Sequence, residues 1–315
     1  MALRGVVGIR EVGPREALQA HPETLPTAQK VELVRRLLAC GVTKINVVSL
    51  VSPKAMPHMA DAEAVLEQLG PIADVDVSGL APNQRAIDRA LALAAKGLLN
   101  EVFLLHAATA SVLRANGLPD SLDSNFAQIA TFAEQAKAAG LRVGVFVSAA
   151  FGCSMEGKVA PAIVLAAVEA IVGLPSVDEV VVSDSTGQAD PVQVAQLLGQ
   201  VSEIVGETPV TVHFHDSRGT GLANAVAAVQ SPIRNLTLDS SFGGLGGDIP
   251  FIPEAAGNVA TEDLVAMLDG MGVRTGIDAA GVAAVAKLYN EWTSVPLRSS
   301  VPNVGPVGWK LRPAS

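Results

Sequence analysis

Residues 142–183 read RVGVFVSAAFGCSMEGKVAPAIVLAAVEAIVGLPSVDEVVVS, and this stretch shows how the chain is built. Two short runs rich in valine, 142–148 and 179–183, lie on either side of a longer run rich in alanine and valine, 160–172. Short β-branched runs are typical of buried strands, whereas the longer run has the length and composition of a helix. The stretch therefore predicts a strand–helix–strand unit whose two strands lie parallel in one sheet.

The same alternation repeats along the chain. The predicted strands are residues 6–12, 43–49, 74–79, 101–106, 142–148, 179–183, 210–215 and 235–240. Helical patterns lie between them at 28–40, 60–69, 84–95, 122–139, 160–172, 191–205 and 221–230, and 262–270 follows the last strand. Eight such units close into a barrel more naturally than they form an open sheet. We therefore expect a (β/α)8 TIM barrel as the catalytic domain over residues 1–292, with a short irregular C-terminal tail over residues 293–315.

The composition fits a globular protein with a core of small side chains. Hydrophobic residues make up 49% of the 315 residues and aromatic ones only 3%, so burial depends on Ala, Val, Leu and Ile. A net charge of −9 without a basic cluster argues against nucleic acid as a partner. Cys40 and Cys153 form neither a CxxC pair nor a disulfide framework. Because we find neither a signal-peptide pattern nor an apolar run of the roughly 18 residues that span a membrane, we expect a cytoplasmic protein with no membrane partner.

Polar residues gather where the predicted strands end. In a barrel of this kind, the loops at the carboxyl ends of the strands carry the catalytic groups. The residues at these ends are Glu11, Arg15, Glu16, Asn46, Ser49, Asn83, His106, Ser148, Asp184, His213, His215, Asp216 and Asn258. Their clustering is the strongest indication from the residues alone that the chain is an enzyme.

His213 and His215 end the seventh predicted strand as an HxH pair. Residues two apart on a strand point to one face, so both imidazoles would reach the same interior space. Histidine is the commonest metal ligand, and Glu16 and Asn258 follow strands at the same mouth and could add two oxygen ligands. Such a donor set suits Mg²⁺ or Mn²⁺, and also Co²⁺ or Zn²⁺. The alternative is a hydrogen-bonded pair that only packs in the core.

Two further charged residues are candidates for catalysis. Arg15 follows the first predicted strand, and its guanidinium could stabilise an enolate oxygen. The alternative for Arg15 is a surface ion pair with Glu11 or Glu16. Asp184 ends the sixth predicted strand and could act as an acid or base, or hold a histidine in one tautomer. The alternative for Asp184 is a turn or helix-capping residue.

Two loops contain the remaining candidates. Four glycines between residues 243 and 247 precede Asp248, and this segment could close over a ligand or form a plain turn. It matches neither a P-loop nor GxGxxG. Cys153 could be a nucleophile, but no adjacent base is evident, so an ordinary loop thiol is the preferred interpretation.

Six segments occur in order along the chain: EVGPREALQ at 11–19, SLVSPK at 49–54, GCSMEGK at 152–158, VHFHD at 212–216, GGLGG at 243–247 and GNVATEDL at 257–264. Through these segments the chain resembles hydroxymethylglutaryl-CoA lyase from about residue 9 to about residue 276. The resemblance implies a member of the metal-dependent lyase and aldolase barrel superfamily. Its small-molecule partner would be an acyl-CoA or a hydroxy-oxo acid, and we also expect a homo-oligomer.

The activity that the resemblance implies is a retro-Claisen cleavage of a 3-hydroxyacyl-CoA. The products would be an acetyl-CoA-type thioester and an oxo acid. The metal ligands that it implies are Glu16, His213, His215 and Asn258. Arg15 would stabilise the enolate oxygen, while Asp184 and His213 would move protons.

Four positions depart from the family pattern. Glu16 stands in place of an Asp, Asn46 of a Glu, Arg218 of a Tyr, and Asp248 of the cysteine that is expected to act as an acid. A carboxylic acid at residue 248 could donate that proton only if its pKa were raised. These changes indicate either an altered substrate or drift within one activity. The alternatives are therefore a metal-dependent aldolase or Claisen-type synthase acting on a hydroxy-oxo acid, and a non-catalytic barrel that binds metal or ligand.

Overall fold

The computed structural model describes residues 3–20, 24–247 and 257–308. Eight parallel strands follow one another around a closed barrel in chain order, and the last pairs with the first. The strands are β1 (Gly8–Glu11), β2 (Lys44–Ser49), β3 (Asp76–Leu80), β4 (Glu101–Ala107), β5 (Arg142–Ser148), β6 (Glu179–Asp184), β7 (Val210–Phe214) and β8 (Leu236–Ser240). The predicted (β/α)8 barrel is confirmed.

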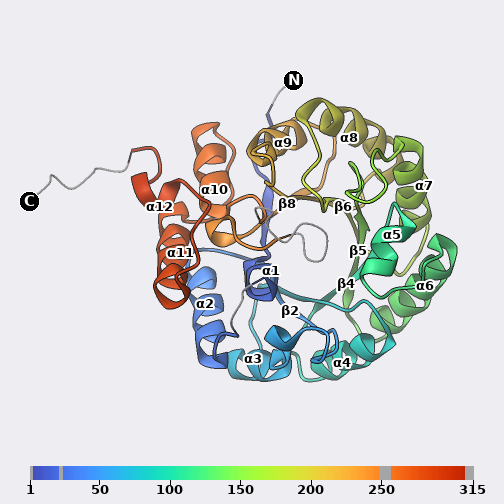
Figure 1. Cartoon of the computed structure of the whole chain (residues 1–315), viewed down its shortest axis with the longest axis horizontal. Helices are drawn as coiled ribbons and strands as arrows, with labels where there is room; N and C mark the ends of the chain where they lie inside the picture. The colour runs from blue at the N-terminus through green and yellow to red at the C-terminus, as the bar shows by residue number, and fades with distance from the viewer. Residues whose placement is uncertain (1–2, 21–23, 248–256, 309–315) are drawn as a thin grey trace, which may run out of the picture.

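Most of the helices form a ring outside the strands, whereas α1 (Gly13–Gln19) lies near the centre of this view, over the barrel (Figure 1). In chain order, the helices are α1, α2 (Thr27–Ala39), η1 (Pro57–Met59), α3 (Ala62–Leu69), α4 (Gln84–Ala94), α5 (Ala110–Ala115), α6 (Leu122–Ala138), α7 (Pro161–Val172), α8 (Pro191–Val205), α9 (Gly221–Val229), η2 (Phe242–Gly244), α10 (Thr261–Gly270), α11 (Ala279–Thr293) and α12 (Val301–Val304). Among the described residues, no helix is both long enough and hydrophobic enough to cross a membrane.

Four α-helices were not expected from the sequence: α1, α5, α11 and α12. The longest of them, α11, begins after Asp278, whose carboxylate accepts a hydrogen bond from the backbone N–H of Ala280 at 3.0 Å. Its Tyr289 ring is buried and packs edge-on against Phe242 of η2, with 5.4 Å between ring centroids. The short helix α12 lies within the range expected to be an irregular tail.

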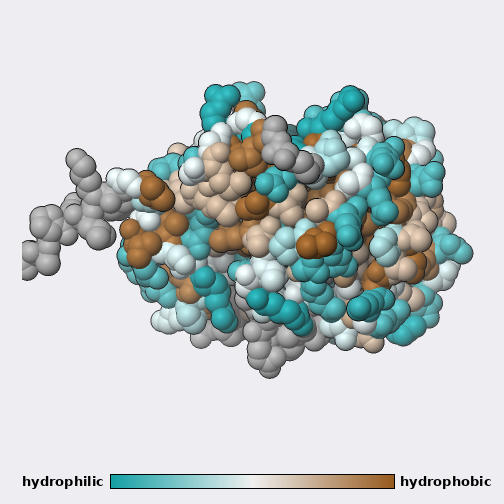
Figure 2. All heavy atoms as spheres, turned by 90° about the horizontal axis from the view of Figure 1, so that it is seen from above, coloured by the Kyte–Doolittle hydropathy of each residue, from teal (hydrophilic) through white to brown (hydrophobic). Residues whose placement is uncertain are grey.

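The core has two parts. Aliphatic side chains fill the space between the strands and the helices, as the composition predicts. Inside the barrel, a smaller cluster of Phe103, Phe146 and Val181 lies beside the buried, charged side chain of Arg10. Gly144 of β5 lies so close to the Phe103 ring that a Cβ there would overlap with it. On the face in Figure 2, hydrophilic and hydrophobic residues are interspersed.

Candidate metal centre and active site

Helix α1 brings Arg15 and Glu16 to the mouth of the barrel directly after β1. Pro14 lies in the first turn of α1, where its missing N–H leaves no helical hydrogen bond unmade. The buried carboxylate of Glu11 accepts hydrogen bonds from the backbone N–H groups of Gly13 at 2.7 Å and Phe242 at 3.1 Å. Glu11 therefore ties the start of α1 to η2, and it fixes the position from which Arg15 and Glu16 reach inward.

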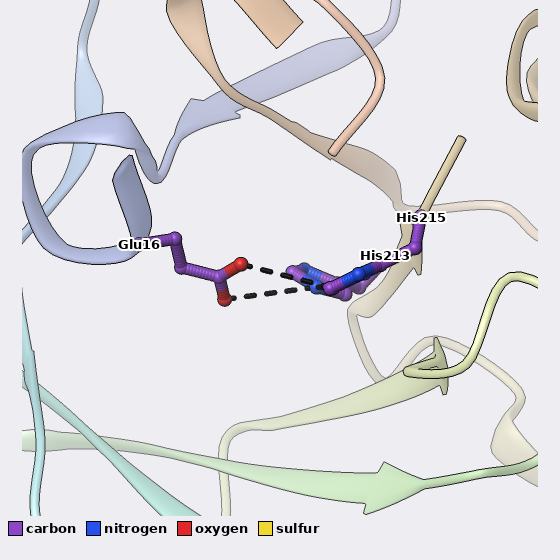
Figure 3. Close-up of side chains that lie close together, drawn as sticks. All are labelled: Glu16, His213 and His215. Carbon is purple, nitrogen blue, oxygen red and sulfur yellow. Dashed lines mark hydrogen bonds and ion pairs between the residues drawn. The ribbon is translucent and has the colours of Figure 1, made fainter. Parts of the chain in front are cut away.

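The two histidines of the HxH pair point into the same space. His213 is in β7, and His215 follows directly and forms an isolated antiparallel bridge with Asn258. The Nε2 atoms of the two rings are 3.1 Å apart. Glu16 faces both rings from α1, with 3.6 Å from Oε1 to Nε2 of His213 and 3.8 Å from Oε2 to Nε2 of His215 (Figure 3).

The donor set fits a divalent cation. Ligand atoms of Glu16, His213 and His215 lie within 4.8 Å of one another. Asn258 donates from Nδ2 to Oε2 of Glu16 at 2.6 Å, whereas its buried Oδ1 has no hydrogen-bond partner among the described residues. A buried acceptor without a partner is unfavourable unless something else binds it. Two imidazoles, a carboxylate and an amide oxygen are ligands that Mg²⁺, Mn²⁺, Co²⁺ and Zn²⁺ all accept.

The charges at the site hold Glu16 in its ionised form. Burial opposes ionisation, but at the acidic pH where Glu16 titrates both imidazoles are protonated, and their charges together with that of Arg15 lower the pKa of Glu16 to about 2. Burial and the neighbouring His213 lower the pKa of His215 to about 4, which keeps that ring neutral. For His213, burial is outweighed by Glu16 and Asp239, and its pKa is raised. The centre therefore contains an ionised carboxylate and a neutral imidazole, as a cation site requires.

Arg15 is buried beside the same centre, with only 6% of its surface exposed. Its Nε donates to Oδ1 of Asn46 at 2.6 Å, and its Nη2 donates to Oε1 of Glu16 at 2.5 Å. Asn46 in turn donates to the Ser78 hydroxyl at 3.0 Å. The alternative stated for Arg15 was a surface ion pair with Glu11 or Glu16. Arg15 does pair with Glu16, but the pair lies in the interior. Arg15 is thus held rigidly with its guanidinium at the site.

A cavity of about 180 Å³ opens directly over these groups, and Arg15, Glu16, His213 and His215 line one side of it. The rest of its wall combines hydroxyl groups with apolar side chains. These lining residues include Ser49, Ser148, Ser183, Ser185, Leu80, Leu105 and Phe146. The buried hydroxyl of Ser49 has no hydrogen-bond partner among the described residues. The cavity therefore suits a small substrate with both polar and methyl groups.

Asp184 is the buried last residue of β6, between the two lining residues Ser183 and Ser185. Both carboxylate oxygens accept backbone N–H groups, from Gln188 at 2.9 Å and Ala189 at 3.0 Å. Burial raises the pKa of Asp184 to about 6 despite these hydrogen bonds. Asp184 is not one of the described residues that line the cavity. This arrangement agrees with the turn-stabilising alternative, and a role in proton transfer stays a prediction.

The two loop candidates have different outcomes. Asp248 lies outside the described residues, so its position relative to the site stays a prediction. Cys153 is buried, and the Thr109 hydroxyl donates to its Sγ at 3.5 Å. Burial raises the pKa of the Cys153 thiol, but the hydroxyls of Thr109 and Ser111 outweigh this effect and lower it. Cys153 is not among the described residues that line the cavity, which agrees with an ordinary loop thiol.

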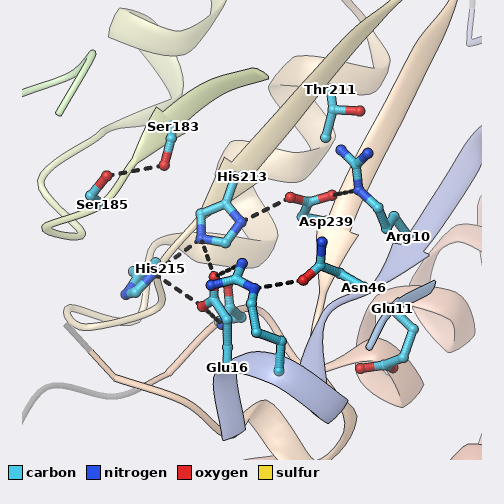
Figure 4. Close-up of polar contacts among 12 residues, drawn as sticks. Arg10, Glu11, Glu16, Asn46, Ser183, Ser185, Thr211, His213, His215 and Asp239 are labelled. Carbon is cyan, nitrogen blue, oxygen red and sulfur yellow. Dashed lines mark hydrogen bonds and ion pairs between the residues drawn. The ribbon is translucent and has the colours of Figure 1, made fainter. Parts of the chain in front are cut away.

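Two residues behind the HxH pair were not predicted from the sequence. Asp239 accepts a hydrogen bond from Nδ1 of His213 at 3.0 Å, and Arg10 donates from Nε to Asp239 at 2.8 Å (Figure 4). The sequence did contain a signal for them. The strands of a parallel barrel are buried, so a charged residue within such a strand predicts a buried ion pair. Arg10 in β1 and Asp239 in β8 are such residues.

Comparison with known proteins identifies the family. The model of the family described as HMGL-like matches residues 7–288, which is most of the chain. The chain belongs to the HMGL-like family. One member of the family, the (R)-citramalyl-CoA lyase of Chloroflexus aurantiacus, is 38% identical over 96% of this chain and 95% of its own. The mitochondrial hydroxymethylglutaryl-CoA lyase of Mus musculus is 36% identical over 86% of this chain and 81% of its own.

A solved structure of an HMGL-like protein has the same fold throughout. The HMG-CoA lyase of Acinetobacter baumannii, in complex with coenzyme A and 3-methylmalate, superposes with a TM-score of 0.90. It is 32% identical in sequence, and the match covers 100% of both chains. These relatives are carbon–carbon lyases, and this HMGL-like chain is an enzyme of the same class.

Proposed function

We propose that this enzyme cleaves a 3-hydroxyacyl-CoA with the help of a divalent cation. The substrate would be hydroxymethylglutaryl-CoA or a related acid such as citramalyl-CoA. The products would be an acetyl-CoA-type thioester and an oxo acid. The observation that carries the proposal is the convergence of Glu16, His213 and His215 on one point of the cavity, with the Arg15 guanidinium beside it.

The class of substrate is supported by the relatives. The citramalyl-CoA and hydroxymethylglutaryl-CoA lyases are named for CoA thioesters, and the Acinetobacter baumannii structure contains coenzyme A with a small hydroxy acid. The cavity here has a matching character, because hydroxyl groups and the methyl-bearing side chains of Leu80 and Leu105 share its wall. An acyl group with a hydroxyl, a carboxylate and a methyl group would meet polar and apolar partners in such a wall.

Glu16, His213, His215 and Asn258 would hold the cation, with Mg²⁺ or Mn²⁺ the first candidates and Co²⁺ or Zn²⁺ compatible with the same ligands. When bound, the cation would supply Lewis acidity that favours loss of a proton from the substrate hydroxyl. Glu16 provides the negative charge of the site, and its pKa of about 2 keeps that charge at all physiological pH values. His213 offers only Nε2, because its Nδ1 is bonded to Asp239.

The cleavage would then follow from the groups around the cavity. The substrate hydroxyl loses its proton, its carbon becomes a carbonyl, and the electron pair of the broken C–C bond moves into a thioester enolate. Arg15, buried and fixed by Asn46 and Glu16, would donate hydrogen bonds to the enolate oxygen. The enolate carbon finally takes up a proton. A ring nitrogen cannot bind a cation and carry a proton at once, so we assign His213 to the cation, and Asp184 and Asp248 remain the predicted proton carriers.

A substrate panel tests the proposed function. Purified protein is freed of metal and incubated with hydroxymethylglutaryl-CoA, citramalyl-CoA or 4-hydroxy-2-oxo acids, each with Mg²⁺ or Mn²⁺. Products are identified by mass. We expect one hydroxyacyl-CoA to yield acetyl-CoA and an oxo acid. Cleavage of the hydroxy-oxo acids alone would contradict the proposal and favour the aldolase alternative.

A further inference from the structure

The interior of the barrel contains a buried arginine below the cation site. Arg10 is 1% exposed, and it is surrounded by carboxylates from three other strands. Its Nε donates to Oδ1 of Asp239 at 2.8 Å, and its Nη2 donates to Oε1 of Glu179 at 2.9 Å. Glu101 lies 3.7 Å from its Nη1. A buried charge that loses its partner is strongly destabilising, so Arg10 and these carboxylates are held in this arrangement.

Asp239 connects this arginine to the cation site. In the β-sheet register, Asp239 is directly opposite Arg10 on β1 and directly opposite His213 on β7. Its two oxygens have separate partners: Oδ1 accepts from Arg10, and Oδ2 faces Nδ1 of His213 at 3.0 Å. An ionised carboxylate only accepts hydrogen bonds. The hydrogen of His213 therefore lies on Nδ1, and the lone pair of Nε2 points toward Glu16 and His215.

The same arginine is also connected to the His213 ring through two phenylalanines. The Arg10 guanidinium lies 4.0 Å from the centroid of the Phe103 ring, a cation–π distance. Phe103 packs edge-on against Phe146 at 5.6 Å, and Phe146 packs edge-on against His213 at 5.8 Å. Arg10 is thus connected to His213 by two routes, one through Asp239 and one through Phe103 and Phe146. His213 is a predicted metal ligand, so both its hydrogen-bond partner and its packing partner lead back to the same buried side chain.

We propose that Asp239, itself oriented by Arg10, is a positioning residue that fixes His213 in the Nδ1–H tautomer, so that Nε2 presents its lone pair to the cation site. The proposal rests on the proposed function only where it concerns the cation, because the tautomer is a property of the metal-free protein. Partners of this kind set the orientation and basicity of a ligating histidine.

The substitution Asp239→Asn separates this role from simple packing, because Asn has almost the same shape. Arg10 Nε requires an acceptor, so the side-chain oxygen of the new residue must face Arg10. Its NH₂ group must then face Nδ1 of His213. Nδ1 can accept that hydrogen bond only if the ring hydrogen moves to Nε2. The substitution is therefore expected to place a hydrogen on the atom that should bind the cation.

The experiment compares the wild type, Asp239→Asn and Thr211→Val, which removes a hydroxyl bonded to Glu179 at the far end of the same network. Histidine is labelled with ¹⁵N, and the tautomers are determined by NMR in chelated protein at alkaline pH, where the neutral rings predominate. We expect the Nδ1–H tautomer of His213 in the wild type and in Thr211→Val, and the Nε2–H tautomer in Asp239→Asn. An Nδ1–H tautomer retained in Asp239→Asn would overturn the proposal.

Calorimetric titration with Mn²⁺ gives the second readout. We expect the affinity of Asp239→Asn to fall by roughly 10–100-fold, the usual effect of losing such a partner, with Thr211→Val unchanged. If Asp239→Asn does not fold, Arg10→Lys serves instead, since it keeps the charge but loses the fork that joins Asp239 and Glu179. Arg10→Lys should also bind Mn²⁺ more weakly, and equal affinity would contradict the proposal. Should the wild type bind no Mn²⁺, the proposed function fails, while the tautomers still decide this inference.

Discussion

The substitution Glu16→Gln removes one negative charge from the centre and almost no volume. In the wild type, Oε1 accepts from Nη2 of Arg15 at 2.5 Å, and Oε2 accepts from Nδ2 of Asn258 at 2.6 Å. An amide has only one acceptor atom for these two donors. Whichever way the new side chain turns, its NH₂ group meets another donor, and Arg15 loses its buried counter-charge. We therefore expect metal-free Glu16→Gln to be less stable than the metal-free wild type.

The magnitude follows from the pKa of Glu16, which is about 2 in the folded protein against 4.5 for the free side chain. That difference corresponds to about 3 kcal/mol of preferential stabilisation of the ionised form. Because the folded-state pKa is depressed, this contribution is fully present above about pH 4.5, and it is lost as the pH falls toward 2. Because part of this preference comes from the His215 charge, which is absent at neutral pH, Glu16→Gln should lose at most about 3 kcal/mol of unfolding free energy there, and its stability should fall less steeply below about pH 4.5.

Urea unfolding in the presence of a chelator, at neutral pH and in steps down to about pH 3, measures both effects. The matched control is Glu32→Gln, which removes an exposed ion pair with Arg36 one helical turn away, at 2.7 Å. Such a pair contributes at most about 0.5 kcal/mol. If Glu16→Gln unfolds with the free energy of the wild type at neutral pH, or with the same dependence on pH, then the charges around Glu16 are not coupled as the structure indicates.

Five other substitutions have definite expected outcomes. His215→Ala should abolish tight Mn²⁺ binding in calorimetry, because one of four predicted ligands is lost, and unchanged affinity would exclude it as a ligand. Arg15→Met should lower kcat by about 10²–10³ with little change in KM, and a near-normal kcat in steady-state kinetics would leave Arg15 a structural role only. Gly144→Ala should destabilise the fold by about 1–3 kcal/mol in urea, because its Cβ would overlap the Phe103 ring. Gly199→Ala, in open space on α8, should be neutral or stabilising by up to about 1 kcal/mol. Asp248→Asn should lose most of its kcat if Asp248 is the proton donor, and full activity would reduce it to a loop carboxylate.

The fold was predictable because parallel strands buried on both faces appear in the sequence as short, unbroken apolar runs. Helix α11 was not, since small apolar residues lie on the exposed as well as the buried face of its first half, which weakens the amphipathic pattern. It packs against α2, α10 and η2, in part through the contact between Tyr289 and Phe242, two residues far apart in the chain. Contacts of this kind are decided by packing, which local patterns do not record.

The cation site was partly predictable for a similar reason. The two-residue spacing of His213 and His215 puts both rings on one face of β7, whatever surrounds them. The role of Asp239 depends instead on the register of β8 between β1 and β7, which brings it opposite both Arg10 and His213. Sequence patterns predict that strands are neighbours in a barrel, but not which residues face each other across them.

The need for a divalent cation in substrate cleavage can be measured directly. The hydroxyacyl-CoA cleaved in the panel is incubated with protein freed of metal by a chelator, and acetyl-CoA is measured as Mg²⁺ or Mn²⁺ is added back. We predict no turnover in the chelated protein, saturable recovery in the wild type, and no recovery in His215→Ala at the cation concentration that saturates the wild type. Full activity in the thoroughly chelated enzyme would contradict the account.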